Sequence, residues 1–191
     1  MKYREFRLTG SGGQGLILAG IILAEAALLD GKNVIQSQAY GPEARGGASK
    51  AEVIISDKEI NYPKIEECDL LLALTQKAYD KYINTLKADG ILIADDSVKL
   101  DIDSNSDIKV YSLPILATAS EKIGKPMVTN MVALGTILAI TDVVSQESLE
   151  NAVLSRVPKG TESLNKQALV EGINLVKKEK RIDSYETCWF N

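Results

Sequence analysis

Residues 6–29 constrain the fold of this chain more than any other segment. A short apolar run ends in GSGGQG, which places four glycines within six residues. Small and aliphatic residues then continue for about four turns of helix. A strand, a glycine-rich turn and a buried helix in this order are typical of the first βα unit of a layered α/β protein. We therefore predict an α/β fold that opens on this glycine-rich turn.

The rest of the chain alternates strand-like and helix-like patterns. Residues 69–74 (DLLLAL) and 90–95 (GILIAD) are apolar apart from one terminal aspartate each, which is typical of central parallel strands covered on both faces. Residues 51–56 follow a loop rather than a helix, so we expect that strand to lie antiparallel to the preceding one. Its polar residues Lys50 and Glu52 are expected to face solvent. We predict strands at 5–9, 33–38, 51–56, 69–74, 90–95 and 109–113.

Helical patterns fill the gaps and dominate the last third of the chain. The helix at 14–30 is expected to end at Gly31 as its C-cap, and an amphipathic helix is expected at 76–87. After Pro114 the pattern predicts helices at 115–123, 126–140, 146–157 and 162–180, followed by a non-helical arm at 181–191. We expect a single domain, residues 1–191, with three layers, a mostly parallel sheet and a helical C-terminal third.

Composition narrows the classes of function. The chain of 191 residues has no histidine, two cysteines and a net charge of −4. A nucleic-acid partner would require a basic face, and a [4Fe–4S] cluster would require four thiolates. Histidine is the most frequent acid–base group near neutral pH and a common metal ligand. We therefore assign no catalytic residue and no metal site to this chain, and expect Cys68 to be a buried, small hydrophobic residue.

The sequence also carries an expectation about location. Every apolar stretch of membrane-spanning length is interrupted by polar or charged groups. Met1-Lys2-Tyr3-Arg4 leads directly into the first strand, which leaves no room for a signal peptide. We expect a cytoplasmic protein.

The glycine-rich turn fits the pattern G-x-G-x-x-G of dinucleotide-binding proteins. Such a site also needs an acidic residue near the end of the second strand, but that strand ends in Gln36 and Gln38. The simpler interpretation is a tight turn with close helix–sheet packing, whose exposed N–H groups can hold another anion or contact a partner. This candidate anion or interface loop consists of Gly10, Ser11, Gly12, Gly13, Gln14 and Gly15.

A second unusual loop follows the second predicted strand. Proline stiffens it, three glycines permit positive φ angles, and one carboxylate and one guanidinium stand two residues apart. It is either a salt-bridged connection between two strands or a rigid loop that offers both charges to a partner or an anionic ligand. The candidate partner or ligand loop consists of Tyr40, Gly41, Pro42, Glu43, Arg45, Gly46 and Gly47, with Ala44 between the two charges.

Three further features have mainly structural interpretations. Asn130 lies among apolar residues and is either a buried, hydrogen-bonded side chain or an interface contact. The nearly apolar helix that contains it is either central or buried in an interface. Asp95 and Asp96 follow a predicted strand, where we expect a helix cap or a turn rather than a metal site.

Three motifs together resemble one family. GSGGQG at 10–15, AYGPEARGGASKAEVIIS at 39–56 and NMVALG at 130–135 look like the gamma subunit of the 2-oxoacid:ferredoxin (or acceptor) oxidoreductases. The resemblance covers nearly the whole chain in order. The form YGPEARGGAS is more similar to the 2-oxoglutarate branch than to the pyruvate branch, whose loop tends to read PERRGAP.

The resemblance implies an assembly that decarboxylates 2-oxoglutarate, transfers the acyl group to coenzyme A to give succinyl-CoA, and passes two electrons to ferredoxin or another acceptor. Thiamine diphosphate with Mg²⁺ and iron–sulfur clusters are then expected in the alpha, beta and delta subunits, and none of them on this chain. Pyruvate, a branched-chain 2-oxoacid and indolepyruvate remain alternative substrates. An alternative of another class is a self-sufficient NAD- or FAD-binding domain.

The resemblance also suggests where this chain meets its partners. We expect the two glycine-rich loops to lie together at the carboxyl ends of the first two strands, facing the alpha subunit or the phosphates of coenzyme A. Asn130 and Gly135 are expected at an interface. Because the helix at 126–140 is so apolar, we also expect the isolated subunit to expose surface there and to self-associate.

Overall fold

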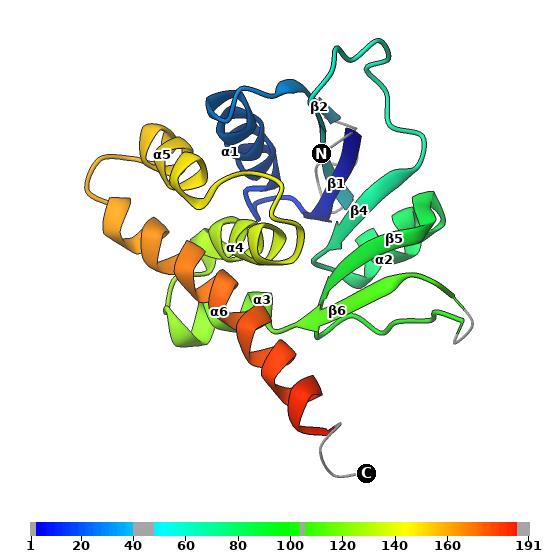
Figure 1. Ribbon diagram of the computed structural model, residues 1–191. Helices are drawn as coiled ribbons and strands as arrows, with labels where there is room; N and C mark the ends of the chain where they lie inside the picture. The colour runs from blue at the N-terminus through cyan, green and yellow to red at the C-terminus, as the bar shows by residue number, and fades with distance from the viewer. Residues whose placement is uncertain (1–2, 40–47, 104–105, 187–191) are drawn as a thin grey trace.

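The computed structural model describes residues 3–39, 48–103 and 106–186, with only the backbone described for residues 39, 48 and 179–186. Figure 1 shows a twisted sheet with most of the helices gathered on one of its faces. The sheet has six strands in the order β2-β3-β1-β4-β5-β6. Their bounds are β1 (Tyr3–Ser11), β2 (Asn33–Ala39), β3 (Ala48–Ser56), β4 (Cys68–Ala73), β5 (Leu86–Asp95) and β6 (Lys109–Leu113).

The sheet is mostly parallel, as predicted. β1, β4, β5 and β6 run in the same direction, and β3 lies antiparallel to both β1 and β2. β2 and β3, which follow β1 in the sequence, lie on one side of β1, and β4, β5 and β6 lie on the other side. The carboxyl ends of β1 and β4 therefore flank the topological switch point, where open α/β sheets bind their ligands.

Both faces of the sheet are covered by helices, which makes three layers. α1 (Leu16–Leu29), α4 (Thr129–Thr141), α5 (Gln146–Arg156) and α6 (Glu162–Glu186) lie on one face, and α2 (Gln76–Tyr82) packs against the other. Side chains alternate between the two hydrophobic clusters: Leu70 and Leu72 join the larger one, and Leu71 joins the smaller. The α/β class and the helical C-terminal third are confirmed.

The first helix ends as its sequence predicts. Gly31 has a φ of 73°, and its N–H donates to the carbonyl of Leu28. The N–H of Lys32 donates to the carbonyl of Ala27. These two hydrogen bonds together form a Schellman motif. Gly31 supplies the left-handed residue that this motif requires.

The largest differences from the predicted helices are in three places. The helix predicted at 76–87 ends at Tyr82 and is followed by the 3₁₀ turn η2 (Ile83–Thr85), because Lys87 belongs to β5 and its ammonium binds two carboxylates on neighbouring strands. The helix predicted at 115–123 divides into α3 (Ile115–Ala117) and the π-helical turn η3 (Thr118–Lys122). The predicted arm at 181–191 was wrong as far as Glu186, since α6 continues to that residue.

The apolar helix α4 is central. It follows the 3₁₀ turn η4 (Pro126–Val128), and every residue from 129 to 138 is buried. α6 crosses it closely, so the chain itself covers the apolar surface. The expectation that this helix exposes apolar surface in the isolated subunit was therefore wrong, although Met127 in η4 is 73% exposed; the expected self-association stays a prediction.

Candidate functional site

The glycine-rich turn joins β1 to α1 at the carboxyl edge of the sheet. β1 ends at Ser11, and α1 begins at Leu16 with Gly15 as its N-cap. Gly13 and Gly15 have φ angles of 89° and 71°, in the region that side chains disfavour. Glycine is therefore required at both positions to reverse the chain between strand and helix. The turn lies at the switch point beside the carboxyl end of β4.

The side chain of Gln14 folds back over the turn. Its Oε1 accepts a hydrogen bond of 2.7 Å from the backbone N–H of Ser11. A Cβ on Gly10 would collide with the same oxygen and would also approach Leu74 Cβ to 3.2 Å. Gly10 thus provides the space that Gln14 occupies, and the turn satisfies one of its own N–H groups.

The N-terminus of α1 receives no such internal cap. The N-cap Gly15 has no side chain that could accept from the first N–H groups of α1, and the first turn of α1 contains no acidic residue. Gly12 and Gly13 are exposed. Within the described residues, this helix end therefore keeps the N–H groups and the dipole that attract an anion or a carboxylate.

Asn130 connects this turn to the C-terminal third of the chain. It is 3% exposed, and its Nδ2 donates to the carbonyl oxygen of Gly15 at 3.2 Å across a separation of 115 residues. Its Oδ1 accepts a 3.0 Å bond from the N–H of Met131. A Cβ on Gly15 would lie 2.5 Å from the Asn130 amide nitrogen. Two of the three motifs noted in the sequence therefore form one contact.

Gly135 lies one turn and a half further along α4, at the crossing with α6. Its Cα is directly opposite Gly172, and neither position has room for a side chain. The structure thus places Asn130 and Gly135 at contacts within this chain. Their expected role at a subunit interface stays a prediction.

The second glycine-rich loop, Tyr40 to Gly47, lies outside the described residues, so the predicted roles of Glu43 and Arg45 stay predictions. The strands that flank it are described: Ala39 ends β2 opposite Lys50 of β3, and Gly10 of β1 is paired with Ser49. Both glycine-rich segments therefore adjoin the same edge of the sheet. β3 lies between β1 and β2 there.

Asp95 stabilises the turn after β5. It is 1% exposed, and its Oδ2 accepts a 2.8 Å bond from the N–H of Leu116 at the start of α3. Its other oxygen accepts bonds from the N–H and the hydroxyl of Ser97. The expected cap and turn are confirmed. Partial burial and the neighbouring Asp95 carboxylate raise the pKa of Asp96.

A buried ion cluster on the α2 face was missed in the sequence. Arg7 is 3% exposed and pairs with Glu52 at 2.7 Å, and Lys50 reaches the same carboxylate at 3.0 Å. The expectation that Glu52 faces solvent was wrong, because β1 and β3 pair in a register that sets Arg7 directly opposite Glu52. The alternation of charged and apolar residues on both strands was visible, but the register was not.

The cysteines of this chain do not fit an iron–sulfur cluster held by four thiolates. The sequence has two cysteines and no histidine. Burial raises the pKa of Cys68 to about 11, so its thiol stays protonated, whereas a cluster ligand is a thiolate. Among the described residues, no three His, Cys, Asp or Glu side chains are grouped so that they could hold a metal ion.

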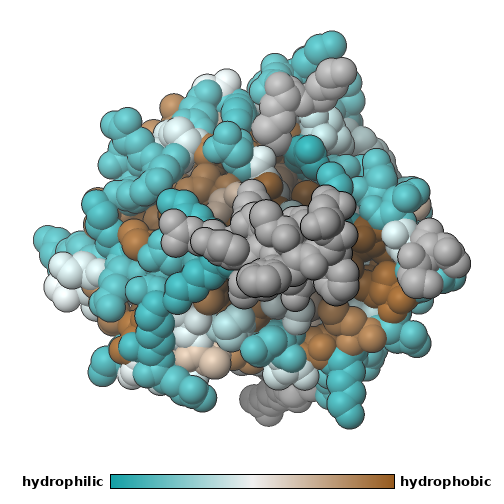
Figure 2. All heavy atoms as spheres, turned by 60° about the horizontal axis from the view of Figure 1, so that its bottom comes forward, coloured by the Kyte–Doolittle hydropathy of each residue, from teal (hydrophilic) through white to brown (hydrophobic). Residues whose placement is uncertain are grey.

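Figure 2 shows a mostly hydrophilic face with apolar patches near its middle. In the part of the chain that the structure describes, no helix has both the length and the apolar character needed to cross a membrane.

Comparison with known proteins gives consistent matches over nearly the whole chain. The family described as pyruvate ferredoxin/flavodoxin oxidoreductase matches residues 5–175. The chain is 49% identical over 176 residues to the 2-oxoglutarate synthase subunit KorC of Methanocaldococcus jannaschii, covering 91% of this chain and 94% of that protein. It is 33% identical over 153 residues to the pyruvate synthase subunit PorC of the same organism, covering 78% and 84%.

A solved structure agrees with these sequences. The gamma subunit of a keto/oxoacid ferredoxin oxidoreductase from Geobacter sulfurreducens is 50% identical to this chain and superposes with a TM-score of 0.79. The alignment covers 90% of this chain and 96% of that one.

Proposed function

This chain belongs to the pyruvate ferredoxin/flavodoxin oxidoreductase family, and on that basis we propose that it is the gamma subunit of a 2-oxoglutarate:ferredoxin oxidoreductase. The assembly converts 2-oxoglutarate and coenzyme A to succinyl-CoA and CO₂. Two electrons leave to ferredoxin or another acceptor. The whole chain acts as one gamma-type domain in a cytoplasmic complex with alpha, beta and delta subunits.

The choice of 2-oxoglutarate is supported by the order of the similarities. Identity is 49% to a 2-oxoglutarate synthase subunit and 33% to a pyruvate synthase subunit. The structural observation that supports the proposal is the hydrogen bond from the Asn130 side chain to the Gly15 carbonyl. This bond joins the GSGGQG and NMVALG motifs at the switch point. The two motifs build one rigid platform rather than two separate sites.

The chemistry of the reaction belongs to groups on other subunits. Thiamine diphosphate with Mg²⁺ supplies the carbon chemistry when bound and iron–sulfur clusters carry the electrons, and we assign both to partner subunits because this chain has only two cysteines, too few for a cluster held by four thiolates. The residues of this chain contribute by where they hold N–H groups and charges, and not by a chemical step of their own. The N-terminus of α1 presents N–H groups and a positive dipole at the platform, held in place by Gln14 and Asn130.

We place the partner contact at this platform and the adjoining loop. The N–H groups of this turn other than those of Ser11 and Gln14, together with the guanidinium of Arg45, then face the alpha subunit or the phosphates of coenzyme A. Both glycine-rich segments adjoin the same edge of the sheet, which supports this placement. Packing against the alpha subunit alone is the simpler form of the same proposal.

An NAD- or FAD-binding function has less support. In a dinucleotide fold the strand after the first helix pairs with β1 and ends in an acidic residue. Here β3 separates β2 from β1, and Gln38 stands near the end of β2.

The decisive experiment is reconstitution of the complex. The subunits encoded beside this chain are co-expressed with and without it, and coenzyme A-dependent reduction of methyl viologen is measured with 2-oxoglutarate, pyruvate and indolepyruvate. We expect activity on 2-oxoglutarate that is lost when this chain is omitted. Full activity without it, or tight NAD or FAD binding by the lone chain, would overturn the proposal.

The loop contact has its own test. Arg45→Ala is expected to weaken assembly or to raise the KM for coenzyme A, because it removes the guanidinium of the loop. Lys159→Ala, at an exposed position between α5 and α6, is the matched control for loss of one positive charge. Normal assembly and unchanged kinetics of Arg45→Ala would remove Arg45 from the site.

A further inference from the structure

The amide of Asn130 reaches the glycine-rich turn from the other half of the chain. Asn130 is the second residue of α4 and is 3% exposed, so its side chain has almost no surface to offer a ligand or a partner subunit. Figure 1 shows α1 and α4 on the same face of the sheet. An effect of Asn130 on binding must therefore act through the residue of the turn that it contacts, which is Gly15.

The two ends of the Asn130 amide have different partners. Its Oδ1 accepts a 3.0 Å hydrogen bond from the N–H of Met131, one of the groups at a helix start that find no partner inside the helix. Its Nδ2 is thereby directed to the carbonyl oxygen of Gly15, at 3.2 Å. The same carbonyl accepts the N–H of Ala19 at 3.0 Å, the first backbone hydrogen bond of α1. Asn130 thus holds the carbonyl at which α1 begins.

The side chain of Asn130 also fills the space beside the turn. A Cβ added to Gly15 would lie 2.9 Å from Asn130 Cγ and 3.3 Å from its Cβ. The backbone of the turn and this side chain are therefore in direct contact. Shortening the side chain to alanine leaves a gap into which the turn can shift.

Glycine gives the turn little conformational preference of its own. Gly12 and Gly13 are exposed, and Gly13 and Gly15 have positive φ angles. Glycine loses more conformational freedom on ordering than any other residue. A turn that is ordered before it binds avoids this loss at the moment of binding, and its affinity is higher by that amount. The hydrogen bond and the packing of Asn130 supply such an order from outside the turn.

We propose that Asn130 is a positioning residue whose amide fixes the direction of the free N–H groups of the glycine-rich turn and thereby sets the affinity of the turn for the oxygen atoms that it binds. These oxygens belong to a coenzyme A phosphate or to the alpha subunit. The inference rests on the proposed function, which places one of the two at the turn. Asn130 then acts through Gly15, in place of the direct interface contact expected from the sequence.

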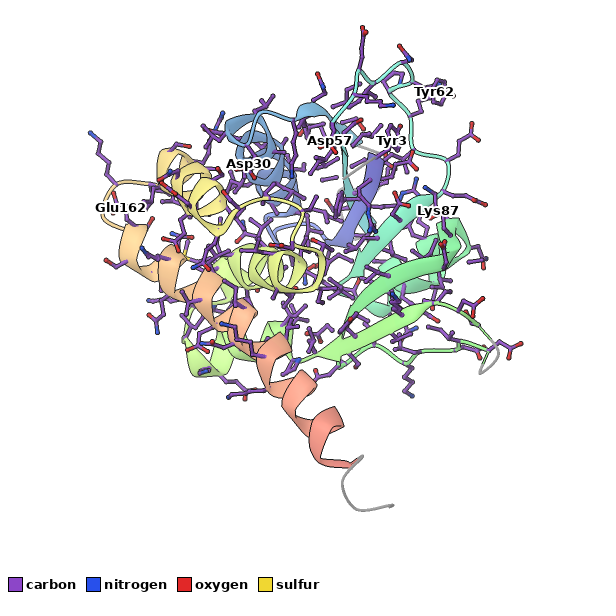
Figure 3. The ribbon with its side chains drawn as sticks, viewed as in Figure 1. Tyr3, Asp30, Asp57, Tyr62, Lys87 and Glu162 are labelled. Carbon is purple, nitrogen blue, oxygen red and sulfur yellow. The ribbon has the colours of Figure 1, made fainter. Side chains whose placement is uncertain are left out.

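Hydrogen exchange of the full-length chain tests the positioning itself. The Ala19 amide reports on the start of α1, and the Asp30 amide, which donates to the Ala26 carbonyl, reports on its end. Figure 3 labels Asp30 at that end of α1. In Asn130→Ala we expect the Ala19 amide to exchange about tenfold faster while the Asp30 amide changes little. No change, or an equal acceleration of both amides, would overturn the inference.

The reconstituted complex tests the consequence for binding. The Kd of this chain for the remaining subunits and the KM for coenzyme A are measured with the wild type and with Asn130→Ala. We expect one of these constants to rise about tenfold, or about 1.4 kcal/mol, while kcat of the assembled complex stays within about twofold. A rise in KM identifies the phosphate as the bound group, and a rise in Kd identifies the alpha subunit. A residue with only a structural role would leave both constants unchanged.

Asn165→Ala is the matched control. Asn165 is 7% exposed, and its Nδ2 donates to the Thr161 carbonyl at 2.8 Å, within its own segment of the chain. Figure 3 labels Glu162, the first residue of α6, at the outer end of this helix. The control removes the same groups from a buried asparagine, and we expect it to leave the Ala19 exchange, the KM and the Kd unchanged. If it changes them as much as Asn130→Ala does, the inference is overturned.

Asn130→Ser provides a second variant if Asn130→Ala does not fold. Its hydroxyl keeps a polar group at the start of α4 but ends one bond short of the amide nitrogen, so the donation to the Gly15 carbonyl is lost. We expect the same changes as in Asn130→Ala. Wild-type values of the Ala19 exchange, the KM and the Kd in this variant would count against the inference in the same way.

The possible failures can be told apart. If the complex is fully active without this chain, or if the wild-type chain does not bind the other subunits, the proposed function fails and this inference fails with it. If the wild-type chain binds and is required, but Asn130→Ala has the KM and the Kd of the wild type, only this inference is overturned.

Discussion

Replacing Gly135 by alanine tests whether the crossing of α4 and α6 is set by close backbone contact. A Cβ at this position would clash with the carbonyl oxygen of Leu169 and would come within 2.9 Å of the Ile173 nitrogen and 3.0 Å of the Gly172 Cα. All three atoms belong to the backbone of α6. None of them can move aside by a side-chain rotation, so the two helices must separate.

The size of the effect follows from two opposing terms. Alanine is favoured over glycine inside a helix by about 1 kcal/mol. Relief of the clash requires the helices to move apart by about 1 Å, which forfeits part of the packing along the crossing. Overpacking of this kind costs about 1–3 kcal/mol, and more when backbone is involved. We expect a net loss of about 2 kcal/mol in the free energy of unfolding.

Urea and thermal unfolding of the purified chain measure this loss. For a chain of this size, about 2 kcal/mol corresponds to a decrease in Tm of about 4–8 °C. Gly20→Ala in α1 is the matched control, because a Cβ there would meet side chains only, at 3.1 Å from Ala51 Cβ. We expect that variant to be at least as stable as the wild type, within about 0.5 kcal/mol.

The comparison of the two variants decides the question. If Gly135→Ala is as stable as Gly20→Ala, the helices separate without cost and the close crossing does not contribute to stability. Gly172→Ala offers an independent check, since a Cβ there would clash with the Val132 carbonyl across the same crossing.

Three further predictions concern single residues. Asn130→Ala should lower the free energy of unfolding, as measured by urea denaturation, by about 1–3 kcal/mol, because the buried Met131 N–H loses its partner and the Gly15 carbonyl keeps only the Ala19 N–H. Burial alone would raise the pKa of Asp30, but hydrogen bonds from Ser148 and Ser145 outweigh it and hold the pKa below its ordinary value. The ionised form of Asp30 therefore stabilises the fold above about pH 4, and this contribution is lost as the pH falls through the lowered pKa. Over that pH range, the Tm of the wild type should decrease more than the Tm of Asp30→Asn. In a Cys188→Ser variant, Cys68 should remain unreactive toward a thiol reagent at pH 8 until the chain unfolds, since burial raises its pKa to about 11; rapid labelling of the native chain would contradict this.

Several parts of the fold and site were readable from local pattern. The glycine-rich turn, the Schellman end of α1 at Gly31 and the cap by Asp95 each depend on residues close together in the sequence. The end of the helix near residue 83 could not be predicted from the local sequence. Lys87 lies in β5 and not in the helix, where its ammonium pairs with Glu5 and Asp69, which are distant in sequence. Likewise Glu52 looks like a surface residue until Arg7 is placed opposite it.

The sequence by itself determined the class of the fold, the mostly parallel sheet and the family. The period of the hydrophobic residues, the positions of the glycines and the order of the motifs are all properties that can be read along the chain. Only the tertiary structure decided that the GSGGQG and NMVALG motifs meet through Asn130 and Gly15. It also decided that β3 separates β1 from β2. Strand order, register and the contact of residues 115 apart are set by how the layers pack. Packing is a property of the whole chain, and no local segment contains it.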